Sequence, residues 1–249
     1  MIFSTRSCFI IAFIFLVSCK PMPQTAVVEY KDYQITKEAP VDSSFIRFLA
    51  PYGSVLKTSM GKVIGFSTEG LSLKQPESTI GNFMADAMKQ QAEKHFNQKV
   101  DAAFVNYGGV RSNISKGKLT VGMIFELMPF DNLIVLQKLS GKVLMQLLDK
   151  IAVDVNGGWP MAGITMEIKD KKATHVLVNG QALNTTNIYI VANSDYVANG
   201  GNDCAMLKGI AQMNKGILLR DALIEYVSWL TANGKSIDAK IENRTTNVN

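Results

Sequence analysis

Residues 101–111, DAAFVNYGGVR, join an apolar run to a pair of glycines and an arginine. The run 101–107 predicts a buried strand that continues directly into Gly108-Gly109. Paired glycines let backbone amides approach an anion closely, and the planar guanidinium of Arg111 can bind a phosphate or a carboxylate through two parallel hydrogen bonds. Because glycine pairs most often mark tight turns, this stretch alone predicts a strand and a turn with the means to hold an anion.

Strand-like and helix-like segments alternate on both sides of this stretch. Asp42 and Ser78 are each followed by apolar residues at helical spacing, which predicts two capped helices. The apolar stripe of the second helix consists of Ile80, Phe83, Met84, Ala87 and Met88. Further helices are expected over Val121–Leu127, 142–153 and about 217–232, and strands over 28–36, 61–67, 133–139, 164–168, 174–178 and 188–193. Asn179-Gly180 is a hairpin signal that joins two of the late strands. This order predicts one α/β domain, with an α+β mixed sheet and flanking helices.

The composition excludes several classes of protein. The chain has 249 residues, of which 47% are hydrophobic and 19% charged, enough for a buried core. A net charge of +5 with no basic run longer than Lys171-Lys172 argues against nucleic acid as a partner. The two histidines, His95 and His175, form no zinc-ligand pair, and the signatures G-x-S-x-G, G-x-x-x-x-G-K-[ST] and G-x-G-x-x-G are missing. The sequence therefore predicts little catalytic equipment and no metal or cofactor held by this chain.

The first residues have the pattern of an export signal. Arg6 precedes the apolar run 8–17, which is too short to span a bilayer. Residues 16–19, LVSC, resemble a bacterial lipobox, which implies cleavage before Cys19 and a lipid on its sulfur. We expect a signal peptide over 1–18, a tether over 19–27 and a single domain over 28–249, in an exported lipoprotein anchored to a membrane on the periplasmic side or at the cell surface. A plain secretory signal with an incidental cysteine is the alternative.

Aromatic residues stand next to other glycine-rich turns. Tyr196 precedes the turn 199–203, NGGND, and Phe130 lies in the segment MPF before a polar pair. A third glycine pair lies in the turn 156–159, NGGW. Aromatic residues are most often part of the core, but two rings on loops next to glycines can enclose a purine. We expect the glycine turns to converge on one ligand.

Five motifs together resemble the substrate-binding C-terminal domain of 5'-nucleotidases. They follow one another in the family's order between residues 61 and 232. The motifs are GNFMADA (81–87), NYGGVR (106–111), LMPFDN (127–132), VNG (178–180) and VANSDYVANGGND (191–203).

The resemblance implies a role for each matching residue. Phe130 and Tyr196 would stack on the two faces of a nucleobase. The phosphate would be held by Asn106 and Arg111, with the amides of Gly108 and Gly109 nearby, and by Lys74, at a position where the family often has arginine. The ribose hydroxyls would be bound by Asn202 or Asp203.

The sequence departs from the family's motifs at three of these positions. Tyr196 replaces a phenylalanine, which keeps the stacking face and adds a hydroxyl. The family's aspartate directly follows the second glycine, whereas Asn202 occupies that place here; either Asn202 takes over the role or the loop bulges to present Asp203. Lys74 cannot form the bidentate contact of an arginine.

Full-length 5'-nucleotidases carry two metals in an N-terminal metallophosphatase domain, and with only two histidines this chain shows no such centre. The resemblance implies the nucleotide-binding half of a 5'-nucleotidase, inactive alone, with divalent metals on a separate metallophosphatase chain. The alternatives are a non-catalytic nucleotide- or nucleoside-binding lipoprotein and a structural surface protein whose pocket has decayed.

Overall fold

The computed structural model describes residues 30–34, 36 and 39–248. The chain divides into two compact units, Met1–Ile46 and Arg47–Asn249. The predicted signal peptide, Cys19 and the tether lie outside the described residues. The strand predicted over 28–36 is wrong for the residues described there: 30–34 and 36 pair with no other strand, and Tyr30 and Tyr33 are exposed. No helix in the described part of the chain combines the length and apolarity needed to cross a membrane.

The first helix, α2 (Ser43–Met60), begins where Asp42 predicts it. The carboxylate of Asp42 accepts hydrogen bonds from the backbone N–H groups of Ser44 and Phe45, at 2.9 and 3.1 Å. These bonds satisfy donors that the helix itself leaves unpaired. No residue of α2 is buried.

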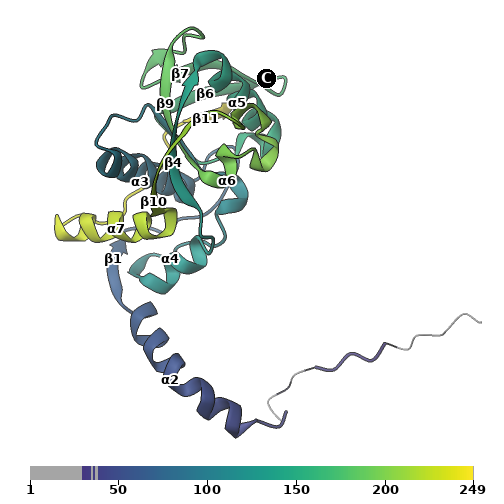
Figure 1. The fold of residues 1–249 in the computed structure, drawn as a ribbon, viewed down its shortest axis with the longest axis vertical. Helices are drawn as coiled ribbons and strands as arrows, with labels where there is room; N and C mark the ends of the chain where they lie inside the picture. Colours follow the sequence, from purple (N-terminus) through teal and green to yellow (C-terminus); the bar gives the residue numbers. More distant parts are fainter. Residues whose placement is uncertain (1–29, 35, 37–38, 249) are drawn as a thin grey trace, which may run out of the picture. The chain divides into compact units, whose positions relative to one another are not determined.

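A mixed five-stranded sheet forms the centre of the second unit (Figure 1). Its central strand β9 (Ile188–Ser194) runs antiparallel to β4 (Leu133–Ser140) and parallel to β2 (Ala102–Phe104). The outer strands, β10 (Gln212–Leu218) and β5 (Met161–Ala162), are both antiparallel to their neighbours. The predicted mixed sheet with flanking helices is confirmed.

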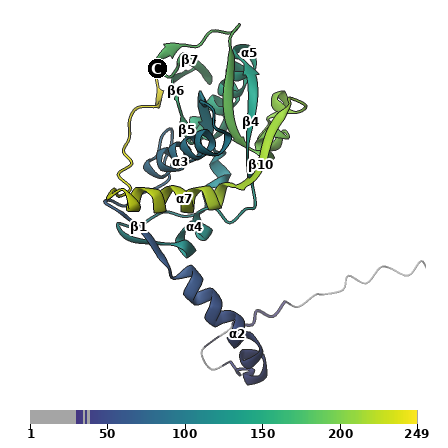
Figure 2. The ribbon, with the colours of Figure 1, turned by 60° about the vertical axis from the view of Figure 1, so that its left-hand side comes forward.

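Helices cover both faces of this sheet. On one face, α3 (Thr79–Phe96) and α7 (Leu219–Ala232) lie side by side (Figure 2). On the other face, α5 (Gly141–Val153) packs between the central sheet and a second sheet. Because successive strand residues point to opposite faces, Ala103 lies in the core under α3 while Ala102 lies in the core under α5.

The second sheet has the order β11-β6-β7-β8. Its strands are β11 (Thr245–Asn247), β6 (Ile164–Lys169), β7 (Lys172–Val178) and β8 (Gln181–Ala182). Asn179 and Gly180 both have positive φ, 48° and 79°, as a two-residue hairpin requires. However, this turn joins β7 to the short strand β8, and the predicted partner strand 188–193 is instead β9 of the central sheet. Strands β1 (Val63–Ser67) and β3 (Gly117–Thr120) form a separate antiparallel pair.

The helix bounds predicted from local sequence signals agree closely with those observed. The hydroxyl of Ser78 accepts the N–H of Gly81, and all five residues of the predicted stripe on α3 are buried. Helix α4 spans the predicted Val121–Leu127, and α7 begins two residues later than predicted because β10 extends to Leu218. The remaining short elements are α6 (Asp195–Ala198) and four 3₁₀ turns: η1 (Tyr107–Gly109), η2 (Asp154–Gly157), η3 (Gly201–Asp203) and η4 (Ala205–Leu207).

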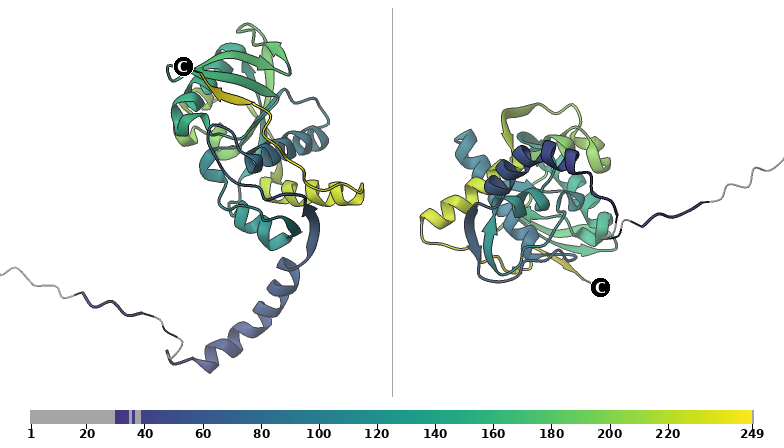
Figure 3. Two further views of the ribbon diagram at one scale, coloured as in Figure 1. Left: turned by 180° about the vertical axis from the view of Figure 1, so that it is seen from behind. Right: turned by 90° about the horizontal axis from the view of Figure 1, so that it is seen from below.

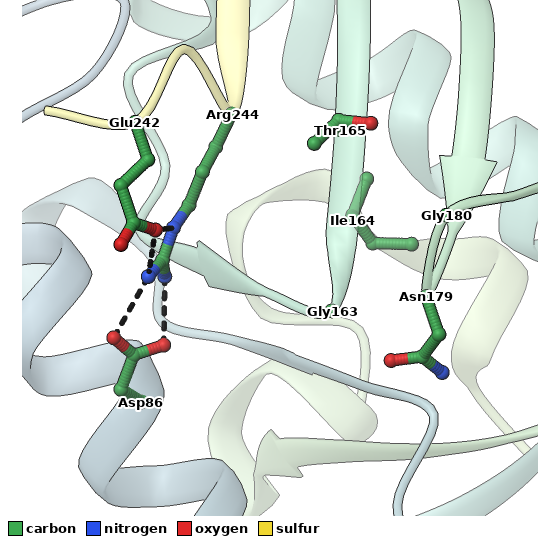
Figure 4. Close-up of a pocket in the computed structure, with 8 residues that line it drawn as sticks. All are labelled: Asp86, Gly163, Ile164, Thr165, Asn179, Gly180, Glu242 and Arg244. Atoms are coloured by element: carbon green, nitrogen blue, oxygen red, sulfur yellow. Dashed lines mark hydrogen bonds and ion pairs between the residues drawn. The ribbon is translucent and has the colours of Figure 1, made fainter.

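The C-terminal segment is fastened to α3 through Arg244 (Figure 4). Its guanidinium donates all five N–H groups: two to Asp86, two to Glu242 and one to the carbonyl of Met161. Burial acts to lower the pKa of Arg244, but the hydrogen bonds and negative charges of Asp86 and Glu242 together outweigh it and raise the pKa above its ordinary value. The carboxylate of Glu77 also accepts the backbone N–H groups of residues 242 and 244. A cavity of about 260 Å³ lies beside this cluster, yet its arginine has no donor left for a ligand.

Candidate functional site

A cavity of about 270 Å³ opens where four loop segments meet. The segments are η1, the turn between α4 and β4, the start of α6, and η3. Its lining consists of two aromatic rings, three asparagines and two glycines: Phe130, Tyr196, Asn106, Asn132, Asn202, Gly108 and Gly109. Six of these seven residues were predicted from the sequence as ligand-binding.

The glycine turn that follows β2 lines one side of the cavity. The carbonyl of Asn106 accepts the N–H of Gly109 at 2.8 Å, which closes the 3₁₀ turn. A Cβ on Gly109 would lie 3.1 Å from Oδ1 of Asn106, tighter than ordinary van der Waals contact. A Cβ on Gly108 would meet nothing closer than 3.7 Å, so the backbone there is open to a ligand. Close backbone approach is the property that the glycine pair predicts.

The two aromatic rings are half-exposed, with 39% of Phe130 and 50% of Tyr196 accessible. A single carboxylate links the segments that carry them. Asp195 accepts the N–H of Leu133 and the N–H of Tyr196, both at 2.9 Å. Since Leu133 begins β4 directly after the turn that contains Phe130, this side chain fixes the two ring-bearing segments to each other.

Tyr196 lies flat on the backbone of Gly201. A Cβ built on Gly201 would be only 2.5 Å from the ring carbon Cζ, so the ring uses space that only glycine leaves. The hydroxyl of Tyr196 accepts the N–H of Asn202 at 3.3 Å. The hydroxyl therefore ties the ring to the glycine loop, a contact that phenylalanine could not make.

The structure places Asn202 in the cavity and leaves Asp203 outside it. Nδ2 of Asn106 donates to Oδ1 of Asn202 at 3.1 Å, which joins the two glycine loops. The side chain of Asp203 is 94% exposed, and its carboxylate lies 3.9 Å from Nζ of Lys150. Both residues adopt the left-handed conformation, with φ of 53° and 59°. Of the two alternatives that the sequence left open, only Asn202 lines the cavity.

Arg111 and Lys74 are exposed and lie outside the cavity lining. The guanidinium carbon of Arg111 is 5.8 Å from the centre of the Phe130 ring. In the described part of the chain Arg111 forms no ion pair, and its exposed guanidinium lies next to a ring that lines the cavity. The segments that carry the two cations run next to each other, because Leu71 and Ile114 form an antiparallel bridge and Leu73 donates its N–H to Asn113.

The third glycine turn, residues 156–159, does not join this site. Gly157 packs against β6, where a Cβ would lie 2.2 Å from Cδ1 of Ile168. Trp159 is buried in the core under α5, and its Nε1 donates to Asp154 at 2.9 Å. Gly157 therefore serves close packing, and only two of the three turns line the cavity.

Sequence reasoning missed three residues of the site. Asn132 lines the cavity and follows Phe130 within the motif LMPFDN, so its position next to a predicted ring was the available signal. Asp195 stands out in the sequence only as a neighbour of Tyr196. Arg220, which contacts the Phe130 turn from α7, lies 89 residues away from Asp131, and no local pattern points to it.

The lining of the cavity contains no carboxylate, imidazole or amine, and its one ionisable side chain is the phenol of Tyr196, whose oxygen already accepts the N–H of Asn202. Both histidines lie elsewhere: His95 pairs with Glu225 at 2.7 Å and His175 with Glu167 at 2.6 Å. Among the described residues, no three His, Cys, Asp or Glu side chains are grouped as a metal site would require. Carboxamides, open backbone amides and two rings suit a planar, hydrogen-bonding ligand.

Comparisons with known proteins point to one family. The family model of the 5'-nucleotidase C-terminal domain matches residues 63–209. The trifunctional nucleotide phosphoesterase protein YfkN of Bacillus subtilis is 34% identical over 144 residues, which cover 52% of this chain and 10% of that protein. A 5'-nucleotidase of Vibrio vulnificus is 25% identical over 202 residues, covering 78% of this chain and 35% of that enzyme.

A solved structure shows the same fold. The 5'-nucleotidase precursor from Thermus thermophilus superimposes with a TM-score of 0.71 and 23% sequence identity, over 84% of this chain and 44% of that one. The chain thus spans between a tenth and about a third of the two curated relatives. With more than half of its residues matched by the family model, the chain belongs to the 5'-nucleotidase C-terminal domain family.

Proposed function

We propose that this chain is the nucleotide-binding half of a 5'-nucleotidase and that a separate metallophosphatase chain carries out the hydrolysis. In this proposal the base lies between Phe130 and Tyr196, and the phosphate is bound by Arg111 and Asn106. The observation that carries it is the pair of half-exposed rings lining a neutral cavity, with a guanidinium at its mouth that forms no ion pair among the described residues.

The neutral lining supports the division of labour. Phosphate ester hydrolysis in two-metal enzymes needs ions that generate and orient the attacking hydroxide. The cavity contributes stacking faces, carboxamides and backbone amides, which bind and orient a ligand but do not activate water. Asn202 stands where the resemblance implies an aspartate, and its neutral amide oxygen is a weaker acceptor for the ribose hydroxyls than a carboxylate would be.

Calorimetry on the full chain in detergent tests whether this chain binds nucleotides. AMP, adenosine and ribose 5-phosphate are titrated with excess EDTA and again with added divalent metal. We expect metal-independent binding of AMP and no release of phosphate by the chain alone. Turnover of AMP by the purified chain would contradict the need for a second chain, and failure of all three ligands to bind would favour a structural surface protein.

Arg111→Ala distinguishes the contribution of the phosphate to affinity from the contribution of the base. Hydrogen bonds to charged groups contribute about 1.5–3 kcal/mol, so AMP affinity should fall about 10- to 150-fold while adenosine affinity stays constant. Arg47→Ala, on exposed α2, is the matched control and should change neither. Equal losses for AMP and adenosine would remove Arg111 from the phosphate site.

We also propose export and lipid anchoring at Cys19, which rests on the sequence alone. Metabolic labelling with a radioactive fatty acid should mark the wild-type chain, and Cys19→Ser should lose the label and leave the membrane fraction. A labelled Cys19→Ser variant would exclude that cysteine as the anchor.

A further inference from the structure

Arg220 contacts the turn that carries Phe130 from the first turn of α7. Its Nη2 donates to Oδ1 of Asp131 at 2.7 Å, and its Nη1 donates weakly to the carbonyl of Phe130 at 3.4 Å. The neighbouring Leu219 donates its N–H to the carbonyl of Asn132 at 2.9 Å. Two consecutive residues of α7 therefore hold three consecutive residues of the turn, two of which line the cavity.

The guanidinium itself is rigidly placed. Arg220 is only 8% exposed, and its guanidinium carbon lies 4.3 Å from the centre of the Phe125 ring on α4. A planar cation stacked on a ring loses little freedom when it forms further hydrogen bonds. Arg220 thus provides a fixed point between α4 and α7 from which the tip of the turn is held.

Stability alone does not account for this arrangement. The side chain of Asp131 is 82% exposed, and ion pairs with a partner so open to water contribute little to folding. In addition, Nε of Arg220 is buried and has no hydrogen-bond partner among the described residues, which is unfavourable. The contacts of this residue act on the position of the turn more than on the free energy of unfolding.

The turn is also held at its other end. Asp195 binds the N–H of Leu133, so without Arg220 the turn would stay attached through Leu133 and through the bond between Leu219 and Asn132. Only residues 130 and 131 would be released. Because 39% of Phe130 is exposed, packing constrains its ring less than it constrains the ring of a fully buried residue.

We infer that Arg220 is a positioning residue that fixes the ring of Phe130 at the cavity and thereby sets the base-dependent part of nucleotide affinity. The inference rests on the proposed function, because it assumes that a base stacks on Phe130. The positional part, that Arg220 holds the ring in the free protein, stands on the contacts alone.

A double-mutant cycle tests the inference in the ligand-bound protein. Arg220→Met keeps a long apolar side chain next to Phe125 and removes the donors and the positive charge. We expect AMP affinity to fall about five- to tenfold, part of the full stacking contribution, with ribose 5-phosphate unaffected. In a Phe130→Ala background, Arg220→Met should have no further effect on AMP, because the ring that it positions is gone. Arg220→Lys, which still reaches Asp131, should restore part of the affinity.

A second readout does not depend on a ligand. Fluorophenylalanine at position 130 should give one sharp ¹⁹F signal in the free wild-type protein and a shifted or broadened signal in Arg220→Met. The same label at Phe66, on β1, should be unchanged. If Arg220→Met fails to fold, the exposed Asp131→Asn variant should produce a smaller shift of the same signal.

The outcomes separate this inference from the proposed function. Equal losses of AMP and ribose 5-phosphate, or an unchanged ¹⁹F signal at position 130, would show that Arg220 is only structural. A wild-type chain that binds no nucleotide would overturn the proposed function, and the ¹⁹F comparison would still decide whether Arg220 holds the ring.

Discussion

Gly201→Ala offers a test of whether Tyr196 is a stacking platform. The added Cβ would lie 2.5–2.6 Å from three carbons at the hydroxyl end of the ring. Ordinary carbon contacts are about 3.5–4.0 Å, so the ring must move by about 1 Å. Since Gly201 does not have a positive φ, alanine fits its backbone and the strain falls on the ring. Half of Tyr196 is exposed, so the ring can move without disturbing the core.

The size of the effect follows from this geometry. Complete loss of a base–aromatic stack costs about 1–3 kcal/mol, which Tyr196→Ala should show. A displaced ring keeps part of its contact, so Gly201→Ala should cost about 1 kcal/mol, roughly a fivefold weaker affinity for AMP. The free energy of unfolding should change by no more than about 0.5 kcal/mol, as for most surface substitutions.

Calorimetry with AMP and ribose 5-phosphate, alongside urea unfolding, distinguishes these effects. Gly70→Ala is the matched control, because a Cβ there meets nothing closer than 3.9 Å. In a Tyr196→Ala background, Gly201→Ala should have no additional effect. An AMP affinity unchanged by Gly201→Ala in the wild-type background would refute the stacking role of Tyr196.

Three further predictions concern groups outside the cavity lining. Burial raises the pKa of the Cys204 thiol to about 11, so iodoacetamide should modify it far more slowly in the native protein than in urea, with peptide mass spectrometry as the readout. The hydrogen bond from Lys94 lowers the pKa of Glu225, so this carboxylate stabilises the fold above its unfolded pKa and loses that contribution as the pH falls through the folded pKa. Glu225→Gln should therefore flatten the loss of stability below about pH 4.5, measured by thermal unfolding. Arg244→Met leaves Asp86 without its cation and should cost about 2–4 kcal/mol in urea unfolding.

Each of these has a result that would contradict it. Rapid native alkylation of Cys204 would show an accessible, more acidic thiol. If the stability of wild type and Glu225→Gln fell in parallel with pH, Glu225 would not be the group that links stability to pH. For Arg244, the control is Lys116→Met, which breaks an exposed ion pair with Glu69 and should change stability by no more than about 0.5 kcal/mol; equal effects of the two substitutions would count against a special role for Arg244.

The helices could be predicted because their signals are local. Ser78 and Asp42 each bind amides within three residues, and the apolar spacing of α3 is visible in one stretch of sequence. Strands such as β10 and β11 were missed because their partners lie about 80 residues away, and their own residues have no clear alternation. The Asn179-Gly180 turn was recognised, but its partner strand is two residues long and too short for a sequence pattern.

The same distinction applies to the candidate site. Phe130, Tyr196 and the two converging glycine turns lie within short motifs, so their residue types were sufficient to find them. The choice between Asn202 and Asp203 depends on left-handed backbone and on a hydrogen bond from Asn106, 96 residues earlier. The turn that contains Gly157 was wrongly predicted to face the ligand. A glycine pair can also make room for a neighbouring side chain of the core, as Gly157 does for Ile168.

Strand β11 is synthesised last, and this order affects the solubility of the unfinished chain. It pairs in parallel with β6, next to which it lies in Figure 3, although about 80 residues separate the two strands in the chain. While the ribosome is still adding those residues, β6 has an open edge that another chain could occupy, and open edges promote aggregation. A nascent or C-terminally shortened chain should therefore depend on chaperones more than the complete one does.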